Sequence, residues 1–224
     1  MQIINASFVR LVPKLPEWLP FQSPLAVATG VALVLIGGTI LAGWQNRLAV
    51  TGLVGLLLVA FGFRLPELAL DSGALANPAK ILALAGGALL VLDPEARRAG
   101  VAAALLGLFL LICGWAHFQY RGFVDGLVPA WIPPDPRFWT YFSAVALLAG
   151  GVGVVLPPTR RMAGVLAGVM IFLWVLLLHI PRSVQFQNAF ELAGVFEALA
   201  LAGVAWLVAA SVTSPGRGTV TSPE

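Results

Sequence analysis

Residues 99–116 read AGVAAALLGLFLLICGWA, eighteen residues in a row without a charged side chain. A helix needs roughly 20 such residues to cross the hydrocarbon core of a bilayer, which is about 30 Å thick. The whole chain shares this character, since 59% of its 224 residues are hydrophobic, 10% are charged and the mean hydropathy is +0.94. The composition excludes a soluble domain and predicts an all-α integral membrane protein.

Six further apolar segments predict, together with this one, seven transmembrane helices. The expected spans cover residues 25–43, 48–63, 79–92, 99–116, 138–156, 162–180 and 189–211. The third is the shortest, and only residues 44–47 separate the first two, which predicts a helical hairpin. Because Pro13, Pro16 and Pro20 interrupt the chain before the first span, we expect no cleaved signal peptide.

Arginines in three short connections predict the orientation of the chain, because Lys and Arg mark cytoplasmic loops. They follow the first, third and fifth spans and are Arg47, Arg97, Arg98, Arg160 and Arg161. The connections at the other side of the membrane contain both acidic and basic residues. We therefore expect the N-terminus outside and the tail inside, although Arg10 and Lys14 favour the reverse.

An internal repeat links the two halves of the chain. The sequence LPEWLP at residues 15–20 recurs as VPAWIP at residues 128–133, and the same offset of 113 pairs Gly37 and Gly38 with the glycines at 150–151. Further along, residues 80–86 align with residues 197–203, which makes Lys80 equivalent to Glu197. Equivalent helices are four spans apart, so we expect parallel repeats that cross the membrane in the same direction.

This register predicts how the chain is divided. The first repeat lacks its opening helix, which gives three helices followed by four. The expected parts are an N-terminal three-helix repeat with an interfacial Pro/Trp segment (residues 1–92), a cytoplasmic linker (93–98), a four-helix repeat (99–211) and a disordered tail (212–224).

Several short motifs of the second repeat, in their order along the chain, resemble the DoxX family of small four-helix membrane proteins. They are GWAHF at 114–118, VPAWIP at 128–133, FWTY at 138–141, GGVG at 150–153, PPTRR at 157–161 and Ile180-Pro181. A fainter likeness covers residues 77–87, NPAKILALAGG. Where DoxX-like proteins often carry a glutamate before the Gly-Gly pair, this chain is apolar around Leu33 and Leu147, so no role for that carboxylate is transferred.

The resemblance implies two DoxX-like repeats and a place beside membrane redox assemblies, such as thiosulfate:quinone oxidoreductase or quinol oxidase. In these assemblies DoxX-like proteins are frequently small subunits without a catalytic centre. We therefore expect a non-catalytic accessory or scaffold subunit of a respiratory or redox complex, whose partners are the lipid bilayer and other membrane subunits. The alternatives are a quinone-interacting oxidoreductase subunit and a small-molecule or proton transporter.

Two ionisable residues inside the expected spans are the first candidates for a site, because buried charges are costly and rare in membranes. Glu197 and Lys80 lie at similar depths, so an ion pair between them would compensate both charges. A proton or ligand site is the functional alternative. Glu191 and Arg182 lie nearer the span ends and are interpreted as loop charges.

Two histidines end the fourth and sixth spans on the same side of the membrane. His117 and His179 are typical interfacial residues, but two histidines can also ligate haem. A quinone pocket lined by His117, Trp115 and Phe118 is the third reading. Since the chain has one cysteine, Cys113, and neither clustered histidines nor paired carboxylates, we expect no metal, no catalytic residue and no cofactor bound by this chain alone, with quinone possible.

The remaining motifs are interpreted structurally. Trp18, Trp131 and Trp139 beside prolines are typical of segments in the headgroup layer, with a partner-docking surface as the alternative. The glycine sets at 30, 37 and 38 and at 150, 151 and 153 favour close helix packing. The 13 basic residues are dispersed, so no nucleic-acid partner is expected. Prolines at span ends argue against the broken helices of a transporter.

Overall fold

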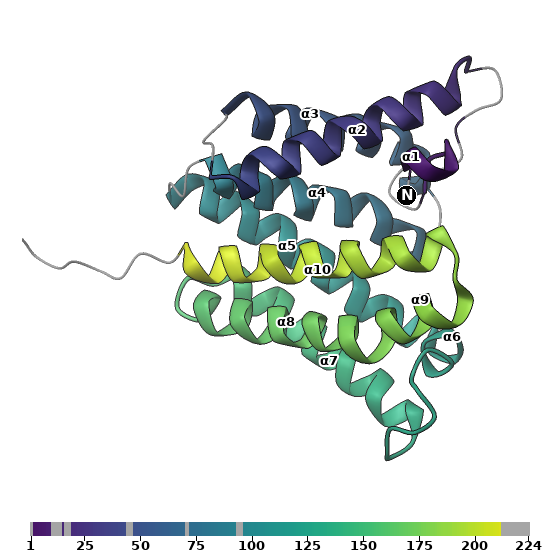
Figure 1. Cartoon of the computed structure of the whole chain (residues 1–224). Coiled ribbons are helices and arrows are strands. Elements are labelled where there is room, and N and C mark those ends of the chain that lie inside the picture. The colour runs from purple at the N-terminus through teal and green to yellow at the C-terminus, as the bar shows by residue number, and fades with distance from the viewer. Residues whose placement is uncertain are drawn as a thin grey trace, which may run out of the picture.

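The computed structural model describes residues 2–9, 15, 19–43, 47–69, 72–92 and 96–211. Within these ranges the chain is helical and contains no strand (Figure 1). Seven of its helical spans are long and apolar enough to cross a membrane. The all-α membrane class and the seven spans expected from the sequence are therefore confirmed.

The spanning elements are α2 (Gln22–Leu41), α3 (Arg47–Arg64), α4 (Ser72–Leu92), α5 (Ala96–Gln119), α7 (Pro136–Val155), α8 (Arg160–Trp174) with its continuation, and α10 (Ala189–Ala210). Helix α8 continues through a π-helical turn, η2 (Val175–His179), into α9 (Ile180–Phe186). Shorter elements are α1 (Gln2–Asn5), the 3-10 turn η1 (Leu65–Ala69) and α6 (Arg121–Asp125).

Side chains at two helix starts explain why the last spans begin where they do. The Asp135 carboxylate accepts a hydrogen bond from the backbone N–H of Arg137 at 2.8 Å, and Pro136 occupies the first helical position of α7. Asn188 caps α10 in the same way, accepting from the N–H of Glu191 at 2.9 Å. These caps satisfy backbone donors that have no partner within the helix.

Two boundaries expected from the sequence are wrong. The third span is not short, because α4 begins at Ser72 and includes Pro78 within the helix. The linker over residues 93–98 is partly helical, since α5 begins at Ala96. Residues 93–95 of that linker and the tail 212–224 lie outside the described residues.

Prolines also fall inside spans, contrary to the expectation that they mark only span ends. Pro78 is fully buried in α4, and Pro181 follows the π-helical turn of the sixth span, which runs to Phe186 instead of ending at residue 180. Neighbouring helices and local changes of helical pitch satisfy the backbone groups that a proline frees, so a membrane helix tolerates it.

Contacts between small residues bring α5 and α7 close together. A β-carbon added to Gly107 would lie 2.8 Å from the carbonyl oxygen of Gly151, and one added to Gly151 would lie 2.9 Å from the carbonyl oxygen of Gly107. Gly114 meets the carbonyl oxygen of Ala144 in the same way at 2.9 Å. The two pairs recur every seven residues on both helices, so the antiparallel backbones touch along one seam.

The glycine sets behave differently in the two halves. Gly151 and Gly153 lie at tight contacts, which confirms the packing role expected for them, whereas Gly150 has only ordinary contacts. In the first half a β-carbon on Gly30 would approach the Ile3 side chain of α1 to 2.9 Å. Gly37 and Gly38 have nothing within 4 Å of an added β-carbon, so the packing expected for them is absent within the described chain.

Helix α2 lies at the periphery of the bundle (Figure 1). It contacts α1 and α3, and 6% of its most apolar window is buried, against 22% for α3 and 56% for α4. The main core instead lies among α4, α5, α7, α8 and α10. These five spans form a body against which α3 packs through a second buried cluster, formed by Leu57 and Ala60 with Ile81 and Ala85 of α4, so α2 is the peripheral span.

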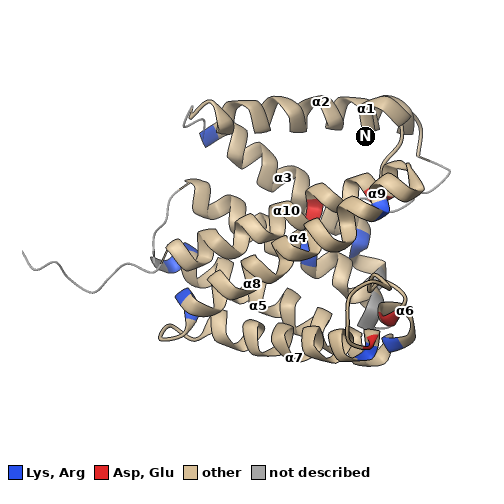
Figure 2. Ribbon diagram, turned by 60° about the horizontal axis from the view of Figure 1, so that its bottom comes forward, with Lys and Arg blue, Asp and Glu red and all other residues tan. Residues whose placement is uncertain are grey.

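The charges of the described residues divide between the two ends of the bundle. Figure 2 shows only Lys and Arg at the end that carries the α2–α3, α4–α5 and α7–α8 connections, and both signs at the other end. The cationic end contains Arg47, Arg97, Arg98, Arg160 and Arg161. Arg160 donates to the carbonyl oxygens of Val154 and Val155 at 3.0 and 3.1 Å and so caps the end of α7.

The α5–α7 seam predicts which alanine substitutions destabilise the protein. Gly107→Ala and Gly151→Ala should each lower the free energy of unfolding by about 1–3 kcal/mol, because the added carbon meets a backbone oxygen that cannot move aside. Gly100→Ala, in open space on the same helix, is the control and should keep its helix-propensity gain of about 1 kcal/mol. The midpoint of thermal unfolding is measured for all three variants in one detergent. Equal midpoints would contradict the close packing of α5 against α7.

Candidate functional site

Lys80 and Glu197 meet inside the bundle. The Lys80 Nζ atom lies 2.6 Å from the Glu197 Oε2 atom, and the two side chains are 10% and 13% exposed. Lys80 projects from α4 two residues after the buried Pro78, and Glu197 projects from α10. The structure therefore brings together the two ionisable residues that the sequence repeat made equivalent.

A second contact shows how α4 and α10 are aligned. A β-carbon added to Gly87 would collide with the Val204 side chain, and both residues lie seven positions after the paired charges. The two residues of each contact are 117 positions apart in the sequence. Moving seven residues along α4 and seven along α10 therefore leads from one contact to the next in the same direction. Helices α4 and α10 consequently run parallel, as the repeat requires of this pair.

The depth of the pair explains why each charge needs the other. Glu197 lies 13 residues before the end of α10 and 8 after its start, which corresponds to roughly 20 Å and 12 Å along the axis. Lys80 lies 12 residues, about 18 Å, before the end of α4. Because these depths fall within the hydrocarbon, an isolated charge would be strongly destabilising, whereas a contacting pair compensates most of that cost.

A second ion pair joins α9 to the start of α10. The Arg182 guanidinium donates to both carboxylate oxygens of Glu191, at 2.7 and 3.2 Å, and lies 5.0 Å from the centre of the Phe186 ring. Glu191 is buried and also lies in the first turn of α10, where a negative charge is favoured by the helix dipole. The interpretation of both residues as loop charges is wrong, because the turn into α10 folds them against each other.

Two buried polar residues were missed by the sequence analysis. Arg64, the last residue of α3, is 8% exposed, and Thr140 is 1% exposed and donates to the Asp125 carboxylate at 2.6 Å. Arg64 precedes Leu65-Pro66 just as His179 precedes Ile180-Pro181, so the repeat was a signal that these positions correspond. Nothing in the sequence pattern distinguishes either residue from an interfacial one.

The aromatic candidates near His117 do not converge on one pocket. The His117 ring stacks on Trp174 with centroids 6.1 Å apart, and its Nδ1 atom lies 2.7 Å from the Cys113 carbonyl oxygen. Trp115 is exposed, and Phe118 packs against Tyr141 at 5.8 Å. Residues two apart on a helix point in nearly opposite directions, which separates Trp115 from His117.

The two histidines lie on different elements, His117 on α5 and His179 in η2. His117 contacts Trp174, the residue directly before the π-helical turn, whereas His179 ends that turn. Within the described residues, no group of three or more His, Cys, Asp and Glu side chains is placed to hold a metal ion.

Trp131, in the α6–α7 connection, and Trp139, in the first turn of α7, have the environment of an interfacial segment. The indole N–H of Trp139 donates to the Pro133 carbonyl oxygen at 3.1 Å, and its ring packs edge-on against Phe138 and Phe142. Trp131 is exposed. Trp18, its repeat counterpart, lies outside the described residues.

The seven apolar spans define a multi-pass α-helical membrane protein. Two ion pairs, Lys80–Glu197 and Arg182–Glu191, connect some of its helices. A family model for a domain of unknown function, DUF8561, matches residues 105–202, from α5 into α10. This segment is less than half of the chain and includes Glu197 but not Lys80. No curated protein and no solved structure matches the chain.

The Lys80–Glu197 geometry predicts strongly coupled effects of substitution. Lys80→Met and Glu197→Gln should each lower the free energy of unfolding by about 3–5 kcal/mol, because the remaining charge is buried without its partner. The double substitution should recover most of that loss. Thermal or denaturant unfolding of the four proteins in one detergent completes the cycle. Additive single effects would mean that the two side chains do not interact.

Proposed function

We propose that this chain is a non-catalytic accessory or scaffold subunit of a respiratory or redox complex in a bacterial or archaeal cytoplasmic membrane. It is built of two parallel DoxX-like repeats, the first without its opening helix. The arginine-rich end faces the cytoplasm, which leaves the N-terminus outside and the C-terminus inside.

The pairing of the buried charges supports a structural role for them. Lys80 is paired with Glu197, and Arg182 with Glu191, at distances of 2.6 and 2.7 Å. Catalysis instead requires acids, bases or nucleophiles that converge on a space where substrate fits. The separate environments of Trp115, His117 and Phe118 give the quinone-site alternative no support.

The surface of α2 is the observation that carries the proposal. Only Ala26 and Gly30 of its described residues are buried, and Gly37 and Gly38 leave open space on it. Glycine pairs on a membrane helix allow another helix to approach closely, so such a surface is suited to a transmembrane helix of a second subunit. A subunit that is attached through α2 would leave the five-span body of this chain intact.

The redox part of the proposal rests on the resemblance to DoxX proteins. Motifs of that kind occupy residues 114–118, 128–133, 138–141 and 150–161, within or next to the segment that the DUF8561 model matches. The parallel alignment of α4 and α10 supports the two-repeat arrangement at one pair of equivalent helices.

Copurification from the native membrane tests the proposal. The chain, extracted in a mild detergent, should carry a second membrane protein and the absorption bands of a haem, flavin or iron–sulfur partner. Gly37→Leu with Gly38→Leu should abolish this association, because the added side chains fill the open surface of α2. Gly203→Leu, at a similarly open position on α10, is the matched control and should leave the association unchanged.

A chain that remains without a partner after cross-linking in the intact membrane would contradict the accessory role. An association that survives both glycine substitutions would contradict the assignment of the partner to α2, because the partner would then bind elsewhere on the bundle.

Proton-coupled transport is the second candidate, because two helix irregularities adjoin the buried charges. Pro78 interrupts the hydrogen bonding of α4 two residues before Lys80, and the π-helical turn Val175–His179 precedes Pro181. Irregular helices of this kind often occur at functional sites in membrane proteins.

Liposomes that contain a trapped pH indicator distinguish this candidate. A transporter should acidify or alkalinise the lumen faster than protein-free liposomes when a membrane potential is applied, and Glu197→Gln should remove the difference. Arg161→Gln, at an exposed charge of the arginine-rich end, is the control and should keep it. Identical rates with and without the wild-type protein would eliminate transport of protons.

A further inference from the structure

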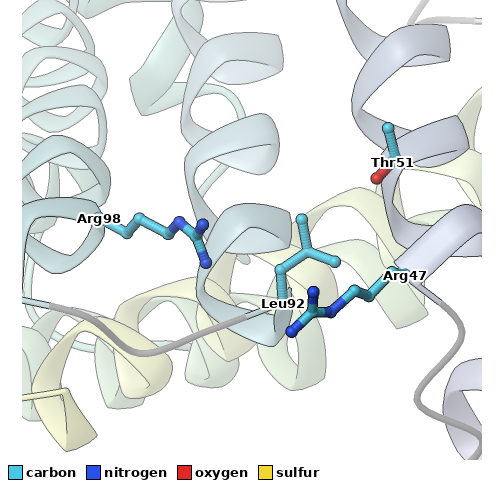
Figure 3. Close-up of a pocket in the computed structure, with 4 residues that line it drawn as sticks. All are labelled: Arg47, Thr51, Leu92 and Arg98. Atoms are coloured by element: carbon cyan, nitrogen blue, oxygen red, sulfur yellow. The ribbon is translucent and has the colours of Figure 1, made fainter.

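A small pocket opens at the arginine-rich end of the bundle, where α3, α4 and α5 meet. It encloses about 130 Å³ and is lined by Arg47, Thr51, Leu92 and Arg98. Figure 3 shows the two arginine side chains reaching towards Leu92 from opposite sides, with the Thr51 hydroxyl above them. Helix α3 contributes a guanidinium group and a hydroxyl group to this space, α4 contributes an apolar side chain, and α5 contributes the second guanidinium group.

The two arginines have a different environment from the arginine that caps a helix nearby. Arg160, which the sequence repeat pairs with Arg47, donates to two carbonyl oxygens at the end of α7. Arg47 is instead exposed at the pocket, and Arg98 enters it from α5. Among the described residues this end of the bundle carries no acidic side chain, while Asp93 and Glu95 of the α4–α5 connection lie outside them.

The lining has the chemistry of a phosphate site. A guanidinium group presents paired N–H donors that match two phosphate oxygens, and a threonine hydroxyl supplies one more donor. Both arginines also lie in the first turn of their helices, α3 and α5, whose dipoles add positive potential at the same place.

The surroundings of the pocket favour a lipid as the source of that phosphate. Leu48 and Val91, next to the lining residues Arg47 and Leu92, are exposed apolar side chains. Further exposed apolar side chains, Leu58, Val59 and Phe63, follow along α3, where acyl chains lie in a bilayer. Basic pockets between helices on the cytoplasmic side are a recurrent site for anionic headgroups.

We propose that Arg47, Arg98 and Thr51 form a binding site for a phosphate group, supplied by the headgroup of an anionic phospholipid in the leaflet at the arginine-rich end. The lipid bridges α3 to α5 across the end of α4, and so adds to the packing that holds α3 against the body of the protein. This role is independent of the accessory function proposed above.

Native mass spectrometry and thermal unfolding of the full-length chain in detergent test the site. The probes are dioleoylphosphatidylglycerol, dioleoylphosphatidylcholine and inorganic phosphate. Phosphatidylglycerol should be retained and should raise the unfolding midpoint more than phosphatidylcholine, whose headgroup is neutral overall. Arg47→Gln with Arg98→Gln should lower the apparent affinity for phosphatidylglycerol at least about tenfold, because two charge-assisted contacts are lost.

A charge-matched variant separates a built site from general surface charge. Arg97→Gln with Arg161→Gln removes the same two charges from exposed positions at the same end and should change the affinity less than about twofold, since neither residue lines the pocket. Arg47→Lys with Arg98→Lys keeps the charge but loses the paired donors, and should lie between the wild type and the glutamine variant. The unfolding midpoint without lipid verifies that each variant is folded.

The outcomes are distinct. Stabilisation by phosphatidylglycerol that requires Arg47 and Arg98 supports the lipid source, and the same dependence for inorganic phosphate alone supports a phosphate site with a soluble ligand. Equal losses in the two glutamine variants would overturn the proposal, because diffuse charge would then explain the binding. It would also be overturned if neither phosphatidylglycerol nor phosphate shifted the midpoint of the folded wild type.

Discussion

Lys80 and Glu197 are separated by 117 residues and lie within the hydrocarbon, where neither charge is stable alone. Their contact joins α4, the last helix of the N-terminal part, to α10, the last helix of the chain. Since an ion pair tolerates little displacement, it also fixes the position of α4 relative to α10 along the helix axes. The close approach of Gly87 and Val204 seven residues further along depends on that level.

Small residues supply the attraction that a hydrophobic core supplies in soluble proteins. Lipid tails are as apolar as leucine, so helices associate in a bilayer through close packing and polar contacts. The Gly107–Gly151 crossing and the contact of Gly164 with the Ala205 carbonyl oxygen bring helix backbones together on both sides of the bundle. Among the described residues, the glycines of α2 make no comparable contact with the five-span body, which is why its surface remains available.

The proposed functions place different demands on the same bundle. An accessory subunit needs a rigid body and an uncovered helix, and both are present in the paired charges and in α2. The phosphate pocket lies where the α2–α3 hairpin meets that body, at Arg47 and Arg98. A lipid bound there would stabilise the position of the hairpin and hence of the surface that a partner uses.

The sequence by itself determined the class of protein, the seven spans and the candidate pair of charges. Apolar runs long enough to cross a bilayer are a local property, and the repeat register made Lys80 and Glu197 equivalent before any contact was known. Local rules also predicted tight packing at Gly151 and Gly153. They placed the start of the third span wrongly, because a proline such as Pro78 reads as a helix boundary unless neighbouring helices cover it.

Only the tertiary structure decided which polar residues are buried and which glycines are covered. Arg182, Glu191 and Arg64 resemble interfacial charges along the chain, and their burial follows from the turn into α10 and from the packing at the end of α3. Trp115 and His117 are close in sequence but diverge because a helix turns about 100° per residue. Gly37 and Gly38 match Gly150 and Gly151 in sequence, yet only the latter pair has a neighbouring helix at packing distance. Burial depends on which helices are adjacent, and adjacency is a property of the assembled bundle.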